Sequence, residues 1–194
     1  KTLNVDSIYC YMFHNYDDFK KYFALFKTEL LELKEAGVIN KIGVSLHGNQ
    51  DIDDVLKFKD VGLIQVPFNL LDNNSKREIV FSKAKRLGVE IHTRSTFLQG
   101  LFFKDIENIK GKTAVLQKYL RELKQMVRND DINSLAINYV YSNPNSDGIL
   151  FGVDTVDQLR KNISCVNNNR FDDIFSDIDS IKVEEEELLN PANW

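Results

Sequence analysis

Several features that mark particular classes of protein are scarce in this sequence. Its 194 residues include only two cysteines, Cys10 and Cys165, with three prolines and nine glycines. Two cysteines are too few for a disulfide framework or a cysteine-based zinc cluster, which favours a reducing, cytoplasmic location. The three histidines lack carboxylates at metal-ligand spacing, so we expect no metal site. Apolar runs fall well short of the roughly 18 residues that a membrane-spanning helix requires.

Clustered positive charge is also missing. The 25 Lys and Arg residues are outnumbered by 29 Asp and Glu residues, giving a formal net charge of −4. Because nucleic acids and anionic membranes bind to basic patches, we expect neither as a partner. The 43 % hydrophobic and 28 % charged content is typical of a globular protein. We expect a single domain over residues 1–194, of which residues 171–194 form a C-terminal tail.

Short apolar runs alternate along the chain with longer amphipathic stretches. The runs predict strands at 8–13, 42–46, 63–66, 89–94 and 148–152. The amphipathic stretches predict helices at 17–36, from about 52, and at 75–87, 114–128, 132–141 and 157–163. No hairpin signal separates any two strands, so the pattern predicts an α/β fold with a parallel sheet.

Two α/β architectures compete for this pattern. A doubly wound sheet usually carries a Gly-x-Gly-x-x-Gly turn, which this sequence lacks. A (β/α)8 barrel gathers polar residues at the carboxyl ends of its strands, as the chain does. These residues are His14, Ser45, His47, Arg94 and Ser95.

Such a barrel needs eight strands and about 200 to 250 residues, and only five strands are predicted here. We therefore interpret the chain as an incomplete (β/α)8 TIM barrel, strands 4–8 with their helices, whose first three units are missing. The start at Lys1 rather than Met is consistent with a processed or truncated protein.

Five segments resemble, in order, the bacterial branch of the aldo-keto reductase family. Residues 6–15 are similar to the family's fourth strand, an Asp-Tyr-apolar run that ends in histidine. Residues 33–45 resemble the passage into the fifth strand, and residues 64–71 the sixth strand, which carries a glutamine. Residues 95–101 match the Ser-x-Leu-x-x-Gly loop after the seventh strand, and residues 152–162 the cofactor signature after the eighth.

This resemblance implies hydride transfer from a nicotinamide cofactor to the carbonyl of an aldehyde, ketone or sugar. In the family an aspartate, a tyrosine, a lysine and a histidine form the catalytic group, and residue matching leaves only His14 here. Charge that develops on the carbonyl oxygen needs a proton donor and hydrogen-bond donors, and the histidine suits the second role. Tyr9 and Tyr11 are predicted to pack within their strand, so the chain alone is expected to be inactive.

The resemblance also implies contacts to the nicotinamide end of the cofactor. Ser45 and Gln65 match positions that hydrogen-bond the carboxamide. Leu46 stands where the family commonly has asparagine, and His47 is a candidate substitute. Arg94 occupies the position of an aromatic ring that stacks on the nicotinamide, and a planar guanidinium both stacks and donates hydrogen bonds.

The remaining contacts implied by the resemblance concern the phosphates and the adenosine. The loop 95–101 would cradle the pyrophosphate with backbone N–H groups, and the helix start near Thr155 would add others. Gln158 stands where an arginine often reads the 2′-phosphate, with Arg160 and Lys161 nearby, and we expect NADP, with NAD as the alternative. The implied cofactor residues are Ser45, Gln65, Arg94, Ser95, Phe97, Leu98, Gly100, Gly152, Thr155, Gln158 and Asn162.

Two other functions stay open. One is a non-catalytic nucleotide-binding or regulatory member of the same fold. The other is an unrelated hydrolase or aldolase barrel, which would require lysine or paired carboxylates at strand ends. Outside the site we expect a solvated acidic run at 184–187, a buried His92 in the core, and Trp194 docked on the barrel exterior. The oligomeric state and the identity of the carbonyl substrate are left open.

Overall fold

A computed structural model describes residues 4–127, 131–166 and 169–194. The chain divides into two compact units. The first comprises Lys1–Val66 and Val80–His92, and the second comprises Pro67–Ile79 and Thr93–Trp194. None of the helices in the described ranges is long and apolar enough to cross a membrane.

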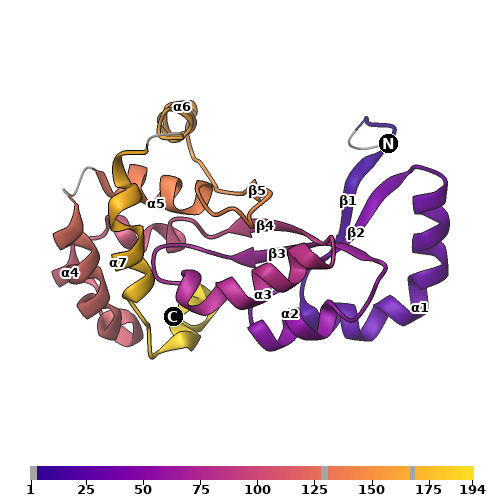
Figure 1. The fold of residues 1–194 in the computed structure, drawn as a ribbon, viewed down its shortest axis with the longest axis horizontal. Helices are drawn as coiled ribbons and strands as arrows, with labels where there is room; N and C mark the ends of the chain where they lie inside the picture. Colours follow the sequence, from indigo (N-terminus) through magenta and orange to yellow (C-terminus); the bar gives the residue numbers. More distant parts are fainter. Residues whose placement is uncertain (1–3, 128–130, 167–168) are drawn as a thin grey trace. The chain divides into compact units, whose positions relative to one another are not determined.

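Five strands of the described chain form one sheet in the order β1-β2-β3-β4-β5 (Figure 1). They are β1 (Ile8–Phe13), β2 (Ile39–Ser45), β3 (Val61–Pro67), β4 (Glu90–Arg94) and β5 (Gly148–Ile149). β1 pairs with β2 and β2 with β3 in parallel, so each connection needs a crossover, which the helices supply. The predicted α/β fold with a parallel sheet is therefore confirmed.

Seven α-helices lie within the described ranges. They are α1 (Tyr16–Glu35), α2 (Asn49–Val55), α3 (Asn74–Arg86), α4 (Gln117–Met126), α5 (Ile132–Tyr141), α6 (Val156–Ser164) and α7 (Phe175–Ser180). Short 3-10 helices occupy Leu98–Phe103, Ile106–Asn108, Gly111–Leu116, Asn169–Ile174, Glu186–Leu189 and Pro191–Asn193. The boundary between the two compact units falls inside β3, α3 and β4.

Two predicted elements differ from the structure. The predicted helix at 114–128 begins within the 3-10 helix Gly111–Leu116, which starts at a glycine with φ +67°, and continues as α4 to Met126. Residue 128 lies outside the described ranges. The predicted strand at 148–152 pairs over two residues only. Its apolar residues continue past the last hydrogen bond to the neighbouring strand, in which the Leu150 N–H donates to the Thr93 carbonyl (2.7 Å).

In the first unit, α1 packs on the β1–β2 pair. The Asn15 side chain begins the helix by accepting a hydrogen bond from the Asp18 N–H (2.7 Å). Phe19 and Phe23 of α1 meet Phe13 of β1 in edge-to-face contacts, with ring centroids 5.5 and 6.1 Å apart. The helix is thus fixed immediately beyond the carboxyl end of β1, where residue 14 lies.

Three ring-bearing side chains in or beside β1 are more exposed than the sequence analysis predicted. His92 is half-buried rather than enclosed in the core, and its ring lies parallel to that of Tyr9 with centroids 6.5 Å apart. Tyr9 and Tyr11 are 51 % and 50 % exposed, so the prediction that they pack within the strand is wrong. The Tyr9 hydroxyl lies 2.6 Å from one Glu90 carboxylate oxygen, and Lys41 also binds that carboxylate. The physical reason is that β1 is an edge strand, whose outer side has no neighbour in the sheet.

In the second unit, the C-terminal segment is anchored to α5 and to the start of α3. The Asn73 side-chain amide donates to the carbonyls of Ile178 (2.7 Å) and Ile181 (2.9 Å). Tyr139 donates its hydroxyl proton to Asp179, and its ring meets Phe175 of α7 edge to face at 5.5 Å. Burial and the bond to Asp179 raise the pKa of Tyr139 above its usual range. In Figure 1 the yellow C-terminal segment accordingly runs alongside α5.

The acidic run of this segment is more than a solvated face. Glu185 is half-buried and accepts hydrogen bonds from the Tyr119 hydroxyl (2.9 Å) and the Lys118 ammonium (3.2 Å). Glu186 pairs with Lys76 at 2.7 Å. Trp194 donates its indole N–H to the Leu188 carbonyl (2.8 Å), so its side chain is bound within the C-terminal segment itself.

Candidate functional site

Three predicted site residues lie at the carboxyl ends of neighbouring strands in the first unit. Ser45, at the end of β2, is in register with Gln65 of β3. Phe13, the last residue of β1, is in register with Val44, so His14 follows at the same edge of the sheet. His14 is exposed, whereas Ser45 and Gln65 are half-buried. Since parallel strands lie about 4.8 Å apart, the three polar side chains form one row.

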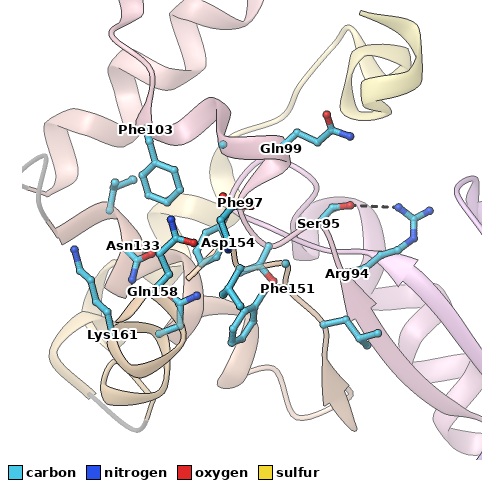
Figure 2. Close-up of a pocket in the computed structure, with 17 residues that line it drawn as sticks. Arg94, Ser95, Phe97, Gln99, Phe103, Asn133, Phe151, Asp154, Gln158 and Lys161 are labelled. Atoms are coloured by element: carbon cyan, nitrogen blue, oxygen red, sulfur yellow. Dashed lines mark hydrogen bonds between the residues drawn. The ribbon is translucent and has the colours of Figure 1, made fainter. Parts of the chain in front are cut away.

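A cavity of about 1020 Å³ lies in the second unit (Figure 2). It contains seven of the residues predicted to bind a cofactor, namely Arg94, Ser95, Phe97, Gly100, Gly152, Gln158 and Asn162. The lining residues absent from that prediction are Thr96, Gln99, Phe103, Ile132, Asn133, Leu150, Phe151, Val153, Asp154 and Lys161. Among the labelled side chains, Figure 2 shows Arg94 and Ser95 at one side of the cavity and Gln158 and Lys161 at the other.

Four residues that the sequence analysis assigned to the cofactor do not line the cavity. Ser45 and Gln65 belong to the first unit, and Leu98 and Thr155 to the second. Leu98 is completely buried, and its N–H donates to the Ser95 carbonyl (2.9 Å). Thr155 is exposed and instead caps α6, where its hydroxyl accepts a hydrogen bond from the Gln158 N–H (3.2 Å). Both residues therefore support the segments that line the cavity, but their own side chains do not line it.

The segment from Ser95 to Gly100 has an unusual backbone. Ser95, Leu98 and Gln99 have φ values of 62°, 44° and 49°, a left-handed region that non-glycine residues rarely occupy. Gly100 follows at φ +77°, and its N–H donates to the Phe97 carbonyl (2.8 Å). Non-glycine residues in this region often mark functional sites, where the surrounding structure holds the strained conformation.

The amino-terminal end of this loop is held on both sides. The Arg94 carbonyl accepts a hydrogen bond from the Phe68 N–H (3.0 Å), and the Ser95 carbonyl accepts one from the Asn69 side chain (3.2 Å). The Arg94 guanidinium donates to the Ser95 hydroxyl at 3.2 Å. The guanidinium is therefore presented to the cavity from a fixed backbone.

A hydroxyl group in the cavity wall lacks a hydrogen-bond partner. Thr96 is 1 % exposed, and for its Oγ1 atom the described residues offer no donor or acceptor. Leaving a buried polar group unsatisfied costs about 1–3 kcal/mol, so such groups are rare in folded proteins. Because Thr96 lines the cavity, a ligand is one source of the missing partner.

A buried ion pair acts on the charge of Arg94. Arg77 forms a buried, bidentate ion pair with Asp72, with two N–O distances of 2.7 Å. Burial, and then the charge of Arg77, hold the pKa of Arg94 below its usual range, against the opposing effect of Asp72.

The opposite wall is formed by the turn before α6. Gln158 accepts a hydrogen bond from the Asp154 N–H (2.7 Å) through its side-chain oxygen, so it fixes the turn as well as lining the cavity. Asn162 is buried one helical turn further on, and Lys161 supplies a second positive charge. Sequence reasoning had noted Lys161 only as a neighbour of Gln158.

These groups are compatible with a dinucleotide. At Gly100 and Gly152 an added Cβ atom would meet nothing within 4 Å, so a ligand can approach the backbone there. Arg94 and Lys161 offer charge for phosphates, amide side chains offer hydrogen bonds, and Phe97, Phe103 and Phe151 offer apolar surface.

The chain is similar to a known protein family over most of its length. The sequence model of the aldo/keto reductase family matches residues 1–183. No curated protein matches the sequence.

Solved structures of reductases share the fold. The holo form of aldo-keto reductase AKR11C1 from Bacillus halodurans gives a TM-score of 0.73 at 22 % identity, covering 95 % of this chain and 65 % of that one. Glycerol dehydrogenase AKR11B4 from Gluconobacter oxydans gives 0.66 at 18 % identity, covering 91 % of this chain and 59 % of that one. An aldo/keto reductase from Brucella melitensis gives 0.62 at 15 % identity, covering 91 % and 63 %. This chain thus spans less than two thirds of the length of each of these relatives.

Proposed function

Because the chain belongs to the aldo/keto reductase family, we propose that it serves an NAD(P)H-dependent reductase of aldehyde, ketone or sugar carbonyls. Membership and fold imply an oxidoreductase, and members of the family generally use a nicotinamide cofactor. The observation that carries the proposal is the cavity, which is lined by seven of the residues expected to contact a cofactor. They come from the end of β4 and the loop after it, from Gly152 and from α6.

Within this proposal the chain contributes β1–β5 as strands 4–8 of a (β/α)8 barrel. His14, Ser45 and Gln65 then stand at the carboxyl end of the sheet, where such barrels place their chemistry. The nicotinamide supplies the hydride when it is bound. Ser45 and Gln65 hydrogen-bond its carboxamide, and the His14 imidazole donates to the substrate carbonyl oxygen, where negative charge develops.

Tyr9, which is close to His14 in the sequence, is poorly suited to supply the proton that the reduced carbonyl requires. The Tyr9 hydroxyl is bound to Glu90, and that hydrogen bond raises the pKa of Tyr9, which makes it a poorer acid. We therefore propose that the tyrosine, lysine and aspartate of the family's catalytic group come from outside this chain, and that the chain alone does not reduce carbonyls.

For the cofactor we propose NADP over NAD. Lys161 lines the cavity beside Gln158 and provides the charge that a 2′-phosphate requires. Asp154, in the same wall, favours the free ribose hydroxyl of NAD, so the preference depends on which of the two side chains faces the ribose. We also propose a cytoplasmic location, which the two free cysteines support.

A non-catalytic nucleotide-binding role is the second candidate, because the chain covers 65 % of the AKR11C1 chain and its Tyr9 hydroxyl is bound to Glu90. Both candidates require the cavity to bind a dinucleotide. They differ in whether carbonyl reduction appears once the remaining catalytic groups are present.

The proposal is tested by fluorescence titration of the chain with NADPH and NADH. We expect saturable quenching or enhancement of the dihydronicotinamide emission with both cofactors. Lys161→Gln removes a charged hydrogen bond to phosphate, so it should weaken NADPH binding about tenfold and NADH binding by less than about twofold. Arg160→Gln is the matched control, because Arg160 lies on the same helix but does not line the cavity. Absence of saturable binding by either cofactor would refute the proposal.

A further inference from the structure

One side of α1 is apolar and exposed. Leu25, Phe26 and Leu33 are 68 %, 52 % and 41 % exposed, and the half-buried ring of Tyr22 lies beside that of Phe26, with centroids 6.3 Å apart. Tyr22, Phe26 and Leu33 recur at helical spacing, and Leu25 is next to them on the helix surface. These four residues form the lateral face of α1.

The lateral face lies on the side of α1 that points away from α2. The other side is in use, because the Tyr16 hydroxyl donates to Asp54 of α2 (3.0 Å) and Lys27 pairs with Asp60 (2.6 Å). At about 100° per residue, Tyr22 is turned roughly 120–140° around the helix from these two positions. Since α2 leads to β3, the lateral face is on the side of the free edge of β1. Figure 1 shows α1 as the outermost helix of the first unit.

The edge strand next to this face is open to pairing. β1 contains no proline and no charged residue, which are the residues that usually protect an edge strand. Its last residue, Phe13, meets Phe19 and Phe23 of α1, so the strand edge and the lateral face belong to one packed unit. A partner that covers both must offer a strand and an apolar helix side by side.

A second copy of this chain offers that combination. A twofold axis perpendicular to the sheet would pair the two β1 strands antiparallel and keep both α1 helices on the same side of the joined sheet. Because α1 packs on the β1–β2 pair, the two helices would then lie about two strand spacings apart, or roughly 10 Å. Packed helices are about 8–10 Å apart, so the strand pairing and the helix contact are geometrically compatible.

The charges beside the lateral face match antiparallel helices. The Lys21 ammonium lies 4.8 Å from the centroid of the Tyr22 ring, in the first half of α1, and Glu29 and Glu32 lie in the second half. Within the described ranges, none of these three charged residues forms an ion pair. Antiparallel helices that cross near Phe26 place Lys21 of each copy opposite Glu29 and Glu32 of the other, whereas parallel helices oppose like charges.

We propose that the chain forms a twofold-symmetric dimer in which β1 pairs with β1 and the lateral face of α1 packs on the same face of the second copy. The inference does not depend on cofactor binding. Strands from outside the chain that complete the proposed barrel would use the same edge of the sheet. The dimer is therefore the state of the chain in their absence.

The experiment is sedimentation velocity of the 194-residue chain over a micromolar concentration series. We expect the parent chain to dimerise. Phe26→Glu places a charge at the centre of the lateral face and should raise the dimer Kd at least about tenfold. Leu87→Glu is the matched control, because Leu87 is 56 % exposed in the same unit but lies outside α1 and β1. Its dimer Kd should agree with that of the parent chain within about twofold.

Charge reversal tests the direction of the two helices. Lys21→Glu turns an attraction between the copies into a repulsion, so it should raise the dimer Kd about fivefold at low ionic strength. Adding Glu29→Lys and Glu32→Lys to this variant restores opposite charges across the interface and should return the Kd towards that of the parent chain. Parallel helices would show neither effect, because like charges face each other before and after the reversal.

Three results would overturn the inference. The first is a monomeric parent chain. The second is a dimer that Phe26→Glu leaves intact, or that Leu87→Glu weakens equally, because the contact would then not use the lateral face. The third is a dimer on which Lys21→Glu has no effect, which would exclude the antiparallel arrangement. Melting by circular dichroism checks that each variant is folded, as expected for substitutions at exposed positions.

Discussion

His14 lies in an exposed bend directly after β1, at the edge of the sheet where Ser45 ends β2 in register with Gln65 of β3. Its imidazole is therefore accessible to a ligand, whereas the phenol of Tyr9 is bound to Glu90. A neutral imidazole N–H that points at a developing alkoxide stabilises charge that is absent from the ground state. The proposed role of His14 is thus specific to the chemical step.

This role predicts the effect of His14→Ala in a reductase that contains the chain. Loss of one donor to the developing oxyanion should lower carbonyl reduction at least about tenfold, with the Kd of the cofactor nearly unchanged. Single-turnover rates at saturating cofactor, together with fluorescence titration, measure the two effects separately. An equal loss of rate and of cofactor affinity would show that His14 acts in cofactor binding instead.

The candidate site residues that the sequence analysis brought together most clearly belong to short motifs. Seven of the expected cofactor residues lie in one cavity because the loop at 95–101 and the signature at 152–162 carry fixed spacing. The sequence analysis did not identify Thr96 as a site residue, because a sequence does not show that a hydroxyl will be buried without a hydrogen-bond partner. The side chain of Leu98 is buried and does not line the cavity, and its residue type gives no signal of its left-handed φ of 44°.

The helices were predictable where apolar residues at helical spacing follow a residue of a type that commonly caps helices. α1 begins after Asn15, a residue type that commonly caps helices, and α5 lies at the predicted 132–141. The acidic run at 184–187 was not predictable, because charge runs are usually solvated and only the fold brings Glu185 to Tyr119 and Lys118. The tail is consequently part of the second unit.

The Glu185 contacts predict how the tail responds to acid. The Tyr119 hydrogen bond, opposed by desolvation and assisted by Lys118, holds the pKa of Glu185 below its usual range. A carboxyl with a lowered folded-state pKa stabilises the fold above the ordinary glutamate pKa of about 4.3, and that contribution is lost as pH falls through the folded value. The protection factors of residues 181–189 in amide hydrogen exchange should therefore fall below about pH 4.3.

Variants identify the group responsible. Glu185→Gln should loosen the tail at neutral pH and flatten this part of the pH profile. Glu187→Gln, which changes an exposed neighbour, should leave the profile unaltered. An unchanged profile in Glu185→Gln would assign the acid response to another carboxyl group.

For the whole molecule, the exposed edge of the sheet is the dominant surface feature of the first unit. β1 ends the sheet, and its residues Ile8, Tyr9 and Tyr11 are 38 %, 51 % and 50 % exposed. An edge strand with unpaired backbone groups and apolar side chains promotes pairing with other strands. The alternation of strands and helices predicted the sheet, but the sequence could not show how far its first strand would be exposed.

We therefore predict that the 194-residue chain self-associates through β1. Tyr11→Lys places a charge on the edge and should shift the chain towards monomer in sedimentation velocity at micromolar concentration. Ile79→Lys is the control, because Ile79 is 82 % exposed but lies on the helix α3 and not on a strand. A parent chain that sediments as a monomer with a sharp cooperative melt would contradict this prediction.

The backbone of the loop from Ser95 to Gly100 has a consequence for the kinetics of binding. Its left-handed residues are held by hydrogen bonds that the loop makes within itself and with Asn69, so its shape does not depend on an incoming molecule. A partner that reaches such a wall meets a surface that is already ordered. Association should then follow a single exponential whose rate rises linearly with ligand concentration, without the plateau that a slow rearrangement would impose.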